Sequence, residues 1–309
     1  MRHLSDAAEV ALLDRAPFVF EHSLKDHPAL SLESLARTIP ELPERCLNHS
    51  KGLDNLAINF DRSFDEHKNG LSLMQSFERL KEVSSYITVM DPIEHPAFRD
   101  LYRALKQDVE DLQQKAGRAP RVYEGRMWLF IASPNAITPF HFDRYSNFLM
   151  QIRGSKQMAV FPNFREDIVP ARACESYMDR EPSKDLWRDE LDVHACKYDF
   201  RPGAALHIPF AGGHYVKNGA EDISISLSFF FQTDETNRWV KAAQFNNRVH
   251  RHLGVQLRPV GKSRFRDGVK ASTLNAVSAM TSSLRKLKGT HLLTTALAHP
   301  LLTSDLPVW

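Results

Sequence analysis

Residues Thr138–Phe161 read T-P-F-H-F-D-R-Y-S-N-F-L-M-Q-I-R-G-S-K-Q-M-A-V-F, and the fold expected for the chain follows from this stretch. His141 and Asp143 are two residues apart, so on an extended backbone both side chains point to the same side. An imidazole and a carboxylate on one side are two of the three ligands of the group that binds non-haem Fe(II). The third must be a His from far along the chain. His214 fits, because it follows a strand-like segment and the tight turn F-A-G-G.

The residues that follow predict a β-hairpin. Asn147–Arg153 is expected as a strand, Gly154-Ser155 as a two-residue turn and Lys156–Phe161 as the returning strand. In that register the side chains of Asn147 and Lys156 share one face of the sheet. Two roles stay open for Lys156. It is either a solvated lysine on an edge strand, or an ammonium group that neutralises the carboxylate of a bound acid beside the metal. Loss of a lysine from such a buried pair costs about 3–5 kcal/mol.

The run T-P-x-H-x-D-x-x-x-N-F-x-x-Q-I-x-G-x-K, followed by I-P-x-x-x-x-H, resembles the Jumonji-C (JmjC, cupin-like) 2-oxoglutarate oxygenases. The resemblance is greatest to their small asparaginyl-hydroxylase-like branch and extends over about residues 123–233. It implies a dioxygenase (hydroxylase) that uses Fe(II), O2 and 2-oxoglutarate as cosubstrate, and that releases succinate. The substrate would be a C–H of a protein side chain or of a small metabolite. Demethylation stays open, because it begins with the same hydroxylation.

By position, the resemblance assigns roles to eight residues. Those that would hold Fe(II), and so be catalytic, are His141, Asp143 and His214. Those that would contact 2-oxoglutarate are Lys156, Thr138, Asn147, Tyr86 and Ser228. Tyr86 is assigned by its place alone, so a core tyrosine is the alternative. Ser228 stands where the asparaginyl hydroxylase has a second Asn.

A second departure from the relatives lies just before the distal His. Relatives often have tryptophans there, whereas this chain has Gly212-Gly213. We expect these glycines to open the wall of the pocket. Both departures, Ser228 and the two glycines, affect which substrate is expected more than which reaction is expected.

Composition narrows the class of protein. The chain has 309 residues, of which 42% are hydrophobic and 25% charged, as in ordinary globular proteins. Its 3 cysteines are too few and too scattered for a disulfide framework or a zinc motif, so we expect a reducing, cytoplasmic setting. The net charge of +2 does not point to nucleic acid or to a membrane. Acids among the first apolar positions and the lack of a long apolar run argue against a signal peptide and a membrane span.

Strand and helix patterns predict the fold class. About eight strands with turn punctuation, and no βαβ alternation, favour a mainly β protein with added helices, built on a double-stranded β-helix (jelly-roll or cupin) barrel. Three parts are expected. Residues 1–83 form a mixed helical and strand region that packs on the barrel. Residues 84–233 form the JmjC/cupin-like catalytic domain, with an insertion at 163–192. Residues 234–309 form a basic helical region.

The last expected strand, Ile223–Thr233, alternates small and large residues. Ser224, Ser226 and Ser228 share one face, and apolar residues share the other. Small hydroxyl-bearing residues that face inwards would leave room for a bound cosubstrate. A strand with one solvated face is the alternative.

The insertion at 163–192 is polar and charged, and long insertions between strands often contact substrates. Tyr177 and Trp187 are the candidates for substrate contact there, and Trp187 could equally anchor the insertion to the core. Other histidines are assigned no metal. We expect His207 to pack or hydrogen-bond. His22, His27 and His49 are expected on the surface.

The C-terminal region is basic, with Asp267 as the single acid between Thr236 and Gly289. Helices are expected at Thr236–Leu253 and Ala271–Leu287. The region is either a solvated helical extension that packs on the barrel or builds a homodimer, or a surface for an acidic partner. No nucleic-acid module accompanies it, so we expect no nucleic-acid partner.

Three hypotheses for function therefore compete. The first is the 2-oxoglutarate-dependent hydroxylase. The second is a metal-binding cupin with other chemistry, which would keep the metal ligands and not need Lys156. The third is a non-catalytic binding protein that uses the basic C-terminal region.

Overall fold

The computed structural model describes residues 2–7 and 9–291. Eleven strands are present in this part of the chain: β1 Phe18–Glu21, β2 Leu47–Lys51, β3 Ser85–Met90, β4 Tyr123–Ala132, β5 Ile137–His141, β6 Ser146–Arg153, β7 Lys156–Val160, β8 Cys196–Phe200, β9 Ala204–Ile208, β10 His214–Asn218 and β11 Ser224–Gln232. The α-helices described are α1 Leu32–Thr38, α2 Phe60–Glu66, α3 Leu73–Glu78, α4 Arg99–Lys115, α5 Ala171–Met178, α6 Asp234–Leu253 and α7 Arg264–His291.

The strands form two antiparallel sheets. The larger has the order β1-β9-β6-β11-β4-β3-β2, and the smaller has the order β5-β10-β7-β8. Leu149 and Leu206 of the larger sheet pack with Met158 and Val216 of the smaller one in a single buried cluster. The inner faces of the sheets therefore meet, as in a double-stranded β-helix, and the predicted fold class is confirmed.

The predicted hairpin in the central stretch is wrong. β6 pairs with β9 and β11 in the larger sheet, whereas β7 pairs with β8 and β10 in the smaller one. Gly154-Ser155 is instead a crossover between the sheets. Gly154 has φ +70°, and a Cβ there would lie 2.2 Å from the carbonyl oxygen of Ile223, so the turn requires glycine. Asn147 and Lys156 still meet in one cavity, because they face each other from opposite walls.

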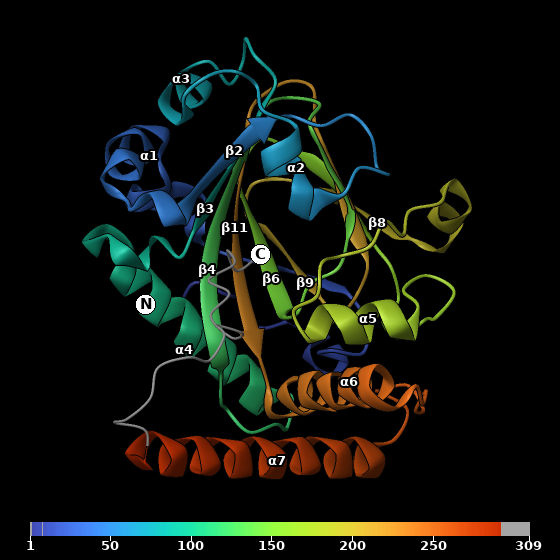
Figure 1. Cartoon of the computed structure of the whole chain (residues 1–309). Coiled ribbons are helices and arrows are strands. Elements are labelled where there is room, and N and C mark those ends of the chain that lie inside the picture. The colour runs from blue at the N-terminus through green and yellow to red at the C-terminus, as the bar shows by residue number, and fades with distance from the viewer. Residues whose placement is uncertain (1, 8, 292–309) are drawn as a thin grey trace.

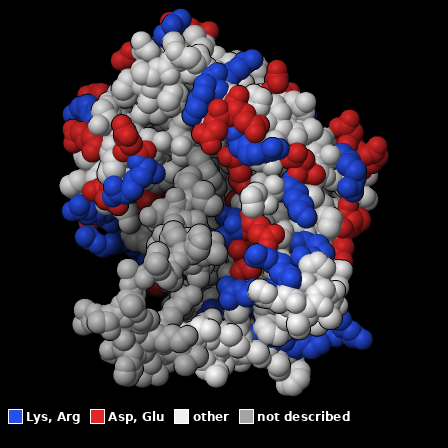
Figure 2. Space-filling view, viewed as in Figure 1, with Lys and Arg blue, Asp and Glu red and all other residues white. Residues whose placement is uncertain are grey.

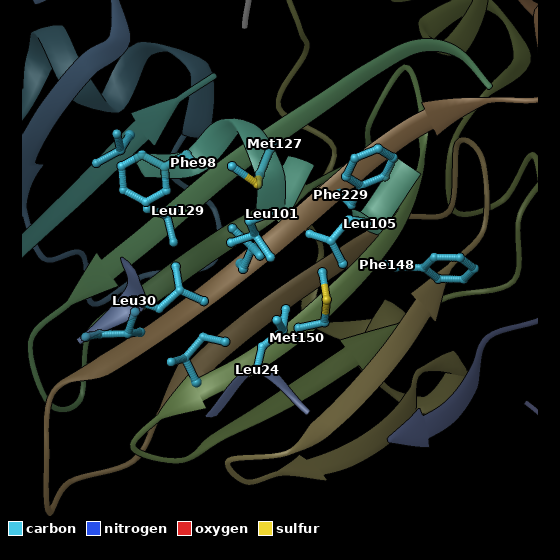
Figure 3. Close-up of a cluster of buried hydrophobic side chains, with 14 of the residues drawn as sticks. Leu24, Leu30, Phe98, Leu101, Leu105, Met127, Leu129, Phe148, Met150 and Phe229 are labelled. Atoms are coloured by element: carbon cyan, nitrogen blue, oxygen red, sulfur yellow. The ribbon is translucent and has the colours of Figure 1, made fainter. Parts of the chain in front are cut away.

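Helices cover the outer face of the larger sheet (Figure 1). The apolar stripe of α4 packs on this face, and its Leu101 and Leu105 lie among Met127, Leu129 and Phe229 of the strands (Figure 3). The apolar residues of α4 recur at helical spacing, as expected of a helix that packs one face on a core. The opposite face of the same sheet is left to line the barrel interior.

The N-terminal residues contribute edge strands as well as helices. β1 pairs with β9 and β2 pairs with β3, so both belong to the larger sheet. The division at residue 84 stays a prediction. His22, expected on the surface, is buried at 7% exposure, and its Nε2 lies 2.9 Å from the carbonyl oxygen of Gln151. That bond to β6 explains why a histidine in a polar sequence context is not solvated.

The C-terminal helices lie next to each other at one end of the barrel (Figure 1). α6 begins after a Thr233 capping box and ends at Gly254, which has φ +68°. Some of its cations are matched, because Arg248 and Arg251 pair with Asp179 and Glu181 of the insertion. Positive and negative side chains are interspersed over the face in Figure 2. A homodimer through these helices and an acidic partner stay predictions, and residues 292–309 of the predicted region lie outside the described residues.

Within the described ranges, none of the helices is both long and apolar enough to cross a bilayer. A cytoplasmic location stays a prediction.

The packing of α4 makes a testable prediction. Leu105 is completely buried between α4 and the larger sheet, so Leu105→Ala should lower the free energy of unfolding by about 2–5 kcal/mol. Leu253 is 72% exposed at the end of α6, so Leu253→Ala should change it by less than about 0.5 kcal/mol. Urea denaturation of both variants checks this. Equal losses would contradict the assignment of the core.

Candidate metal centre and cosubstrate pocket

Pairing of β5 with β10 brings the predicted metal ligands together. His141 ends β5, His214 begins β10, and the two are direct partners in the ladder. Asp143 lies in the turn after β5, and its Oδ2 is 3.6 Å from Nε2 of His214. One ligand atom from each of the three side chains lies within 4.8 Å of the others. The structure thus brings all three predicted ligands to one point.

Both histidines are held with one ring nitrogen free. Nδ1 of His141 donates to the carbonyl oxygen of Pro139 at 2.8 Å, and Nδ1 of His214 donates to that of Gly212 at 3.0 Å. A carbonyl oxygen only accepts, so each Nδ1 carries the proton and each Nε2 keeps its lone pair. Hydrogen bonds of this kind fix the tautomer and the orientation of histidines that bind metals.

Burial shifts the pKa values of two of the predicted ligands, His141 and Asp143. Burial, together with the neighbouring His214, holds the pKa of His141 well below its ordinary value, so its imidazole is neutral at pH 7. Burial also raises the pKa of Asp143, an effect that His214 partly opposes. Two imidazole nitrogens and a carboxylate form a donor set for a divalent cation with nitrogen and oxygen preference.

A cavity extends from these three residues into the barrel. Its walls come from both sheets, and Lys156 pairs with Asn218 at the opposite end of β10 from His214. Tyr86, Thr138, Asn147 and Ser228, predicted from the resemblance, also line it. The structure therefore places every predicted site residue in or beside one cavity.

Lys156 is buried at 8% exposure, so it is not a solvated edge-strand lysine. Its Nζ donates to Ser226 Oγ, and that hydroxyl donates to Gln151 Oε1 at 3.2 Å. Among the described residues no carboxylate forms an ion pair with Lys156. Burial without a counter-ion lowers its pKa from 10.5 to about 7.

The other residues predicted to contact the cosubstrate form two hydrogen-bonded pairs. Thr138 Oγ1 donates to Tyr86 Oη at 3.2 Å, and Asn147 Nδ2 donates to Ser228 Oγ at 3.0 Å. The serines of β11 face the cavity, and the alternative of a solvated face is wrong, because every residue of β11 is buried. Their contacts with a cosubstrate stay predictions.

Three buried polar atoms on the cavity wall have no hydrogen-bond partner in the described part of the chain. They are Asn147 Oδ1, Asn218 Oδ1 and Trp128 Nε1. Buried polar groups are normally paired, so these atoms indicate that a polar ligand belongs in the cavity.

Several cavity residues were not predicted as site residues, and four of them are aromatic: Phe60, Trp128, Phe130 and Phe230. Phe60, the first residue of α2, stacks on His141 with ring centroids 4.5 Å apart. Trp128 and Phe230 form the neighbouring wall, with their ring centroids 5.1 Å apart. Asn59 could have revealed α2, because Asn before F-D-R-S-F is an N-cap signal, and it does accept the bond from Arg62 N.

Next to the metal residues the cavity continues into an arm with several aromatic residues in its walls. Tyr177 of α5 is one of them, at 5% exposure, and Arg144 stacks on its ring at 3.6 Å. Substrate contact through Tyr177 stays a prediction. Trp187 packs against Phe140 and Tyr215, so it anchors the insertion to the core as in the alternative hypothesis.

The expectation for Gly212-Gly213 is wrong. Neither glycine lines the cavity, and a Cβ on Gly213 would come within 2.6 Å of the Phe140 ring. The glycines therefore allow Phe140 to pack closely behind the metal residues and do not open a wall. His207 lies outside the metal group, as predicted, and is completely buried and hydrogen-bonded.

Comparison with known proteins agrees with this geometry. Residues 6–237 match the family described as Cupin-like domain, which is well over half of the chain. The solved structure of Escherichia coli YcfD is similar at a TM-score of 0.50 and 16% identity, over 92% of this chain and 69% of that chain.

A second structure of E. coli YcfD, described as a ribosomal oxygenase in complex with cobalt and 2-oxoglutarate, has a TM-score of 0.47 and 15% identity. It is matched over 85% of this chain and 61% of that chain, so this chain spans less than two thirds of its length. At 16% identity the first of these structures shows a shared fold. The match over residues 6–237 establishes the family: the chain belongs to the cupin-like domain proteins.

Proposed function

We propose that the protein is an Fe(II)- and 2-oxoglutarate-dependent dioxygenase that hydroxylates a C–H of its substrate. The observation that carries the proposal is Lys156, a buried lysine without an anion in the described structure, in the same cavity as His141, Asp143 and His214. A buried charge needs a partner, and a dicarboxylate that also reaches the metal would supply one. A metal-binding cupin with other chemistry has no use for this lysine.

The donor set fits iron. His141, Asp143 and His214 would bind it through two imidazole nitrogens and one carboxylate oxygen, and this facial arrangement leaves positions open for other ligands. The carbonyl oxygens of Pro139 and Gly212 would keep both imidazoles in the binding tautomer.

The polar residues of the cavity fit 2-oxoglutarate. Lys156, with Ser226 beside it, would bind the far carboxylate. Thr138 and Tyr86 offer hydroxyl groups to the same molecule, and the Asn147–Ser228 pair offers an amide N–H and a hydroxyl group. Bound together, iron and 2-oxoglutarate supply oxidation by O2, in which one oxygen atom enters succinate and the other enters the substrate, with loss of CO2.

The residues of this chain position the reactants and exclude water. Phe60 covers one face of His141, and Trp128 and Phe230 line the arm beside the metal residues. An apolar, enclosed arm limits hydrolysis and strengthens the interactions of the charged ligands.

The substrate is proposed to be a protein side chain or a small metabolite, and demethylation remains one outcome of the same chemistry. The E. coli protein is described as a ribosomal oxygenase, which is a reason to test peptides first. We also propose a cytoplasmic location, since the three cysteines are free.

Substrate-independent formation of succinate tests the proposal. Lys156→Ala should raise the KM for 2-oxoglutarate by about a hundredfold or more, because an ion pair worth about 3–5 kcal/mol is lost. His141→Ala should abolish turnover. Lys217→Ala is the matched control, since Lys217 is exposed on β10, and it should behave as wild type. A wild-type protein that binds metal but does not use 2-oxoglutarate would favour the other cupin chemistry. A wild-type protein that does neither would favour the binding-protein hypothesis.

Metal affinity should fall on acidification. Protons compete with the metal at His141 and Asp143, and because the pKa of His141 is held well below its ordinary value, the loss at this histidine sets in below the ordinary imidazole range. Affinity for Co(II) should drop by about tenfold per pH unit for each proton displaced. Titration from pH 7.5 down to 4 checks this. His49→Gln, which does not line the cavity, should follow the wild type, and a profile that stays flat down to pH 4 would count against histidine ligation.

The affinity for 2-oxoglutarate should fall as the pH rises above 7. Lys156 has a pKa of about 7 in the free protein, so above pH 7 it is mostly neutral and must take up a proton to bind a carboxylate. The Kd should therefore rise by up to about tenfold per pH unit between pH 7 and 9, measured by calorimetry on the Co(II)-loaded protein. Lys156→Arg, which is always charged, should remove this dependence. A wild-type Kd that does not rise with pH would contradict the role of the lysine.

A further inference from the structure

Asp14 lies between the two segments that deliver metal ligands, although it comes from the start of the chain. Its side chain is completely buried, and its backbone is left-handed at φ 56°. Such a conformation is costly for a residue other than glycine and persists where neighbouring contacts fix it. The site described above does not include this residue.

The carboxylate of Asp14 bonds both ligand segments through one oxygen. Ser146 Oγ donates to Oδ1 at 2.5 Å, and the backbone N–H of Phe210 donates to the same atom at 3.4 Å. Ser146 follows Asp143 closely in the sequence, and Phe210 precedes His214 across the turn that carries Gly212. A single side chain therefore spans the segments that hold two of the three ligands.

The backbone of Asp14 extends this contact to the cosubstrate wall. Its N–H donates to His207 Nε2 at 2.9 Å, and His207 Nδ1 donates to the carbonyl oxygen of Asn147 at 3.2 Å. Asn163 Nδ2 lies 3.2 Å from the carbonyl oxygens of both Asp14 and Phe210. The second carboxylate oxygen, Oδ2, accepts from Arg118 at 3.2 Å, which supplies a counter-ion.

We infer that Asp14 is a positioning residue for the metal centre, which sets the distance between the Asp143 and His214 segments. The inference rests on the proposed function, because it needs a metal at His141, Asp143 and His214. Residues that orient metal ligands typically change metal affinity by about 10–100-fold when they are replaced. A purely structural anchor would change stability without a specific effect on the metal.

Asp108 provides the matched control. It is a buried carboxylate at 3% exposure that also tethers the N-terminal segment, through the N–H groups of His3 at 2.7 Å and Leu4 at 3.0 Å. Within the described part of the chain, Asp108 makes no hydrogen bond or ion pair with either ligand segment. Loss of Asp108 therefore loosens the same segment of chain without touching the metal residues.

The experiment measures the Kd for Co(II) and the visible spectrum of the Co(II) protein, beside the melting temperature, for Asp14→Ala, Asp14→Asn and Asp108→Ala. We expect Asp14→Ala to weaken Co(II) binding by about 10–100-fold and to alter the spectrum. Asp14→Asn, which keeps one acceptor oxygen, should lie between it and the wild type. Asp108→Ala should lower the melting temperature and leave the Kd within about twofold.

Ser146→Ala removes the bond to the Asp143 segment alone, so it keeps the test valid if Asp14→Ala does not fold. It should weaken Co(II) binding several-fold with little loss of stability, as estimated for a single hydrogen bond of about 1 kcal/mol. Equal Co(II) affinities for the Asp14, Ser146 and Asp108 variants would overturn the inference. If the wild type itself bound no Co(II), the proposed function would fall first, and this inference with it.

Discussion

The antiparallel pairing of β5 with β10 is the contact on which the site depends. It sets His141 opposite His214 within one sheet, so the two imidazoles come together by main-chain hydrogen bonds and not by flexible loops. A turn after β5 then brings Asp143 to 3.6 Å from His214. Short sequence spacing supplies two donors, and the strand pairing supplies the third. Sites built on strands in this way are held more tightly than sites built on loops.

The other end of the cavity is organised by charge. Lys156 is buried with only Ser226 close to its ammonium group, and burial lowers its pKa to about 7. A buried ammonium without an anion is unfavourable, and proteins keep such groups where a ligand completes them. The cavity is thus polarised between a metal-binding end and a carboxylate-binding end.

Sequence patterns predicted the parts of this site that depend on local spacing. The His141–Asp143 pair follows from a period of two residues, His214 from its place after a strand-like segment and a tight turn, and the barrel class from about eight strands with turn punctuation, and all are present. The hairpin failed because a Gly-Ser turn can join strands of one sheet or of two, and only long-range pairing decides between them. Gly212-Gly213 failed for a similar reason, since the ring of Phe140 that fills the space comes from another strand.

Contacts between segments that are far apart in the sequence could not be predicted either. Phe60 reaches His141, and Asp14 reaches Phe210, from parts of the chain with no motif. His22 was misassigned because its partner, the carbonyl oxygen of Gln151, leaves no signature in the sequence. The pattern of residues in one sequence predicts local structure. Pairings between distant segments depend on the completed fold.

The crossover at Gly154-Ser155 has a further consequence for the shape of the cavity. Only three Cα–Cα steps, at most about 11 Å, separate the end of β6 at Arg153 from the start of β7 at Lys156, so opposite walls are tied together there and cannot move far apart. At the metal end the walls are completed by α2 and the insertion, which are joined to the barrel by side-chain packing and by longer connections. The width of the pocket is therefore constant where the small dicarboxylate would sit. Differences in substrate size have to be accommodated at the other end.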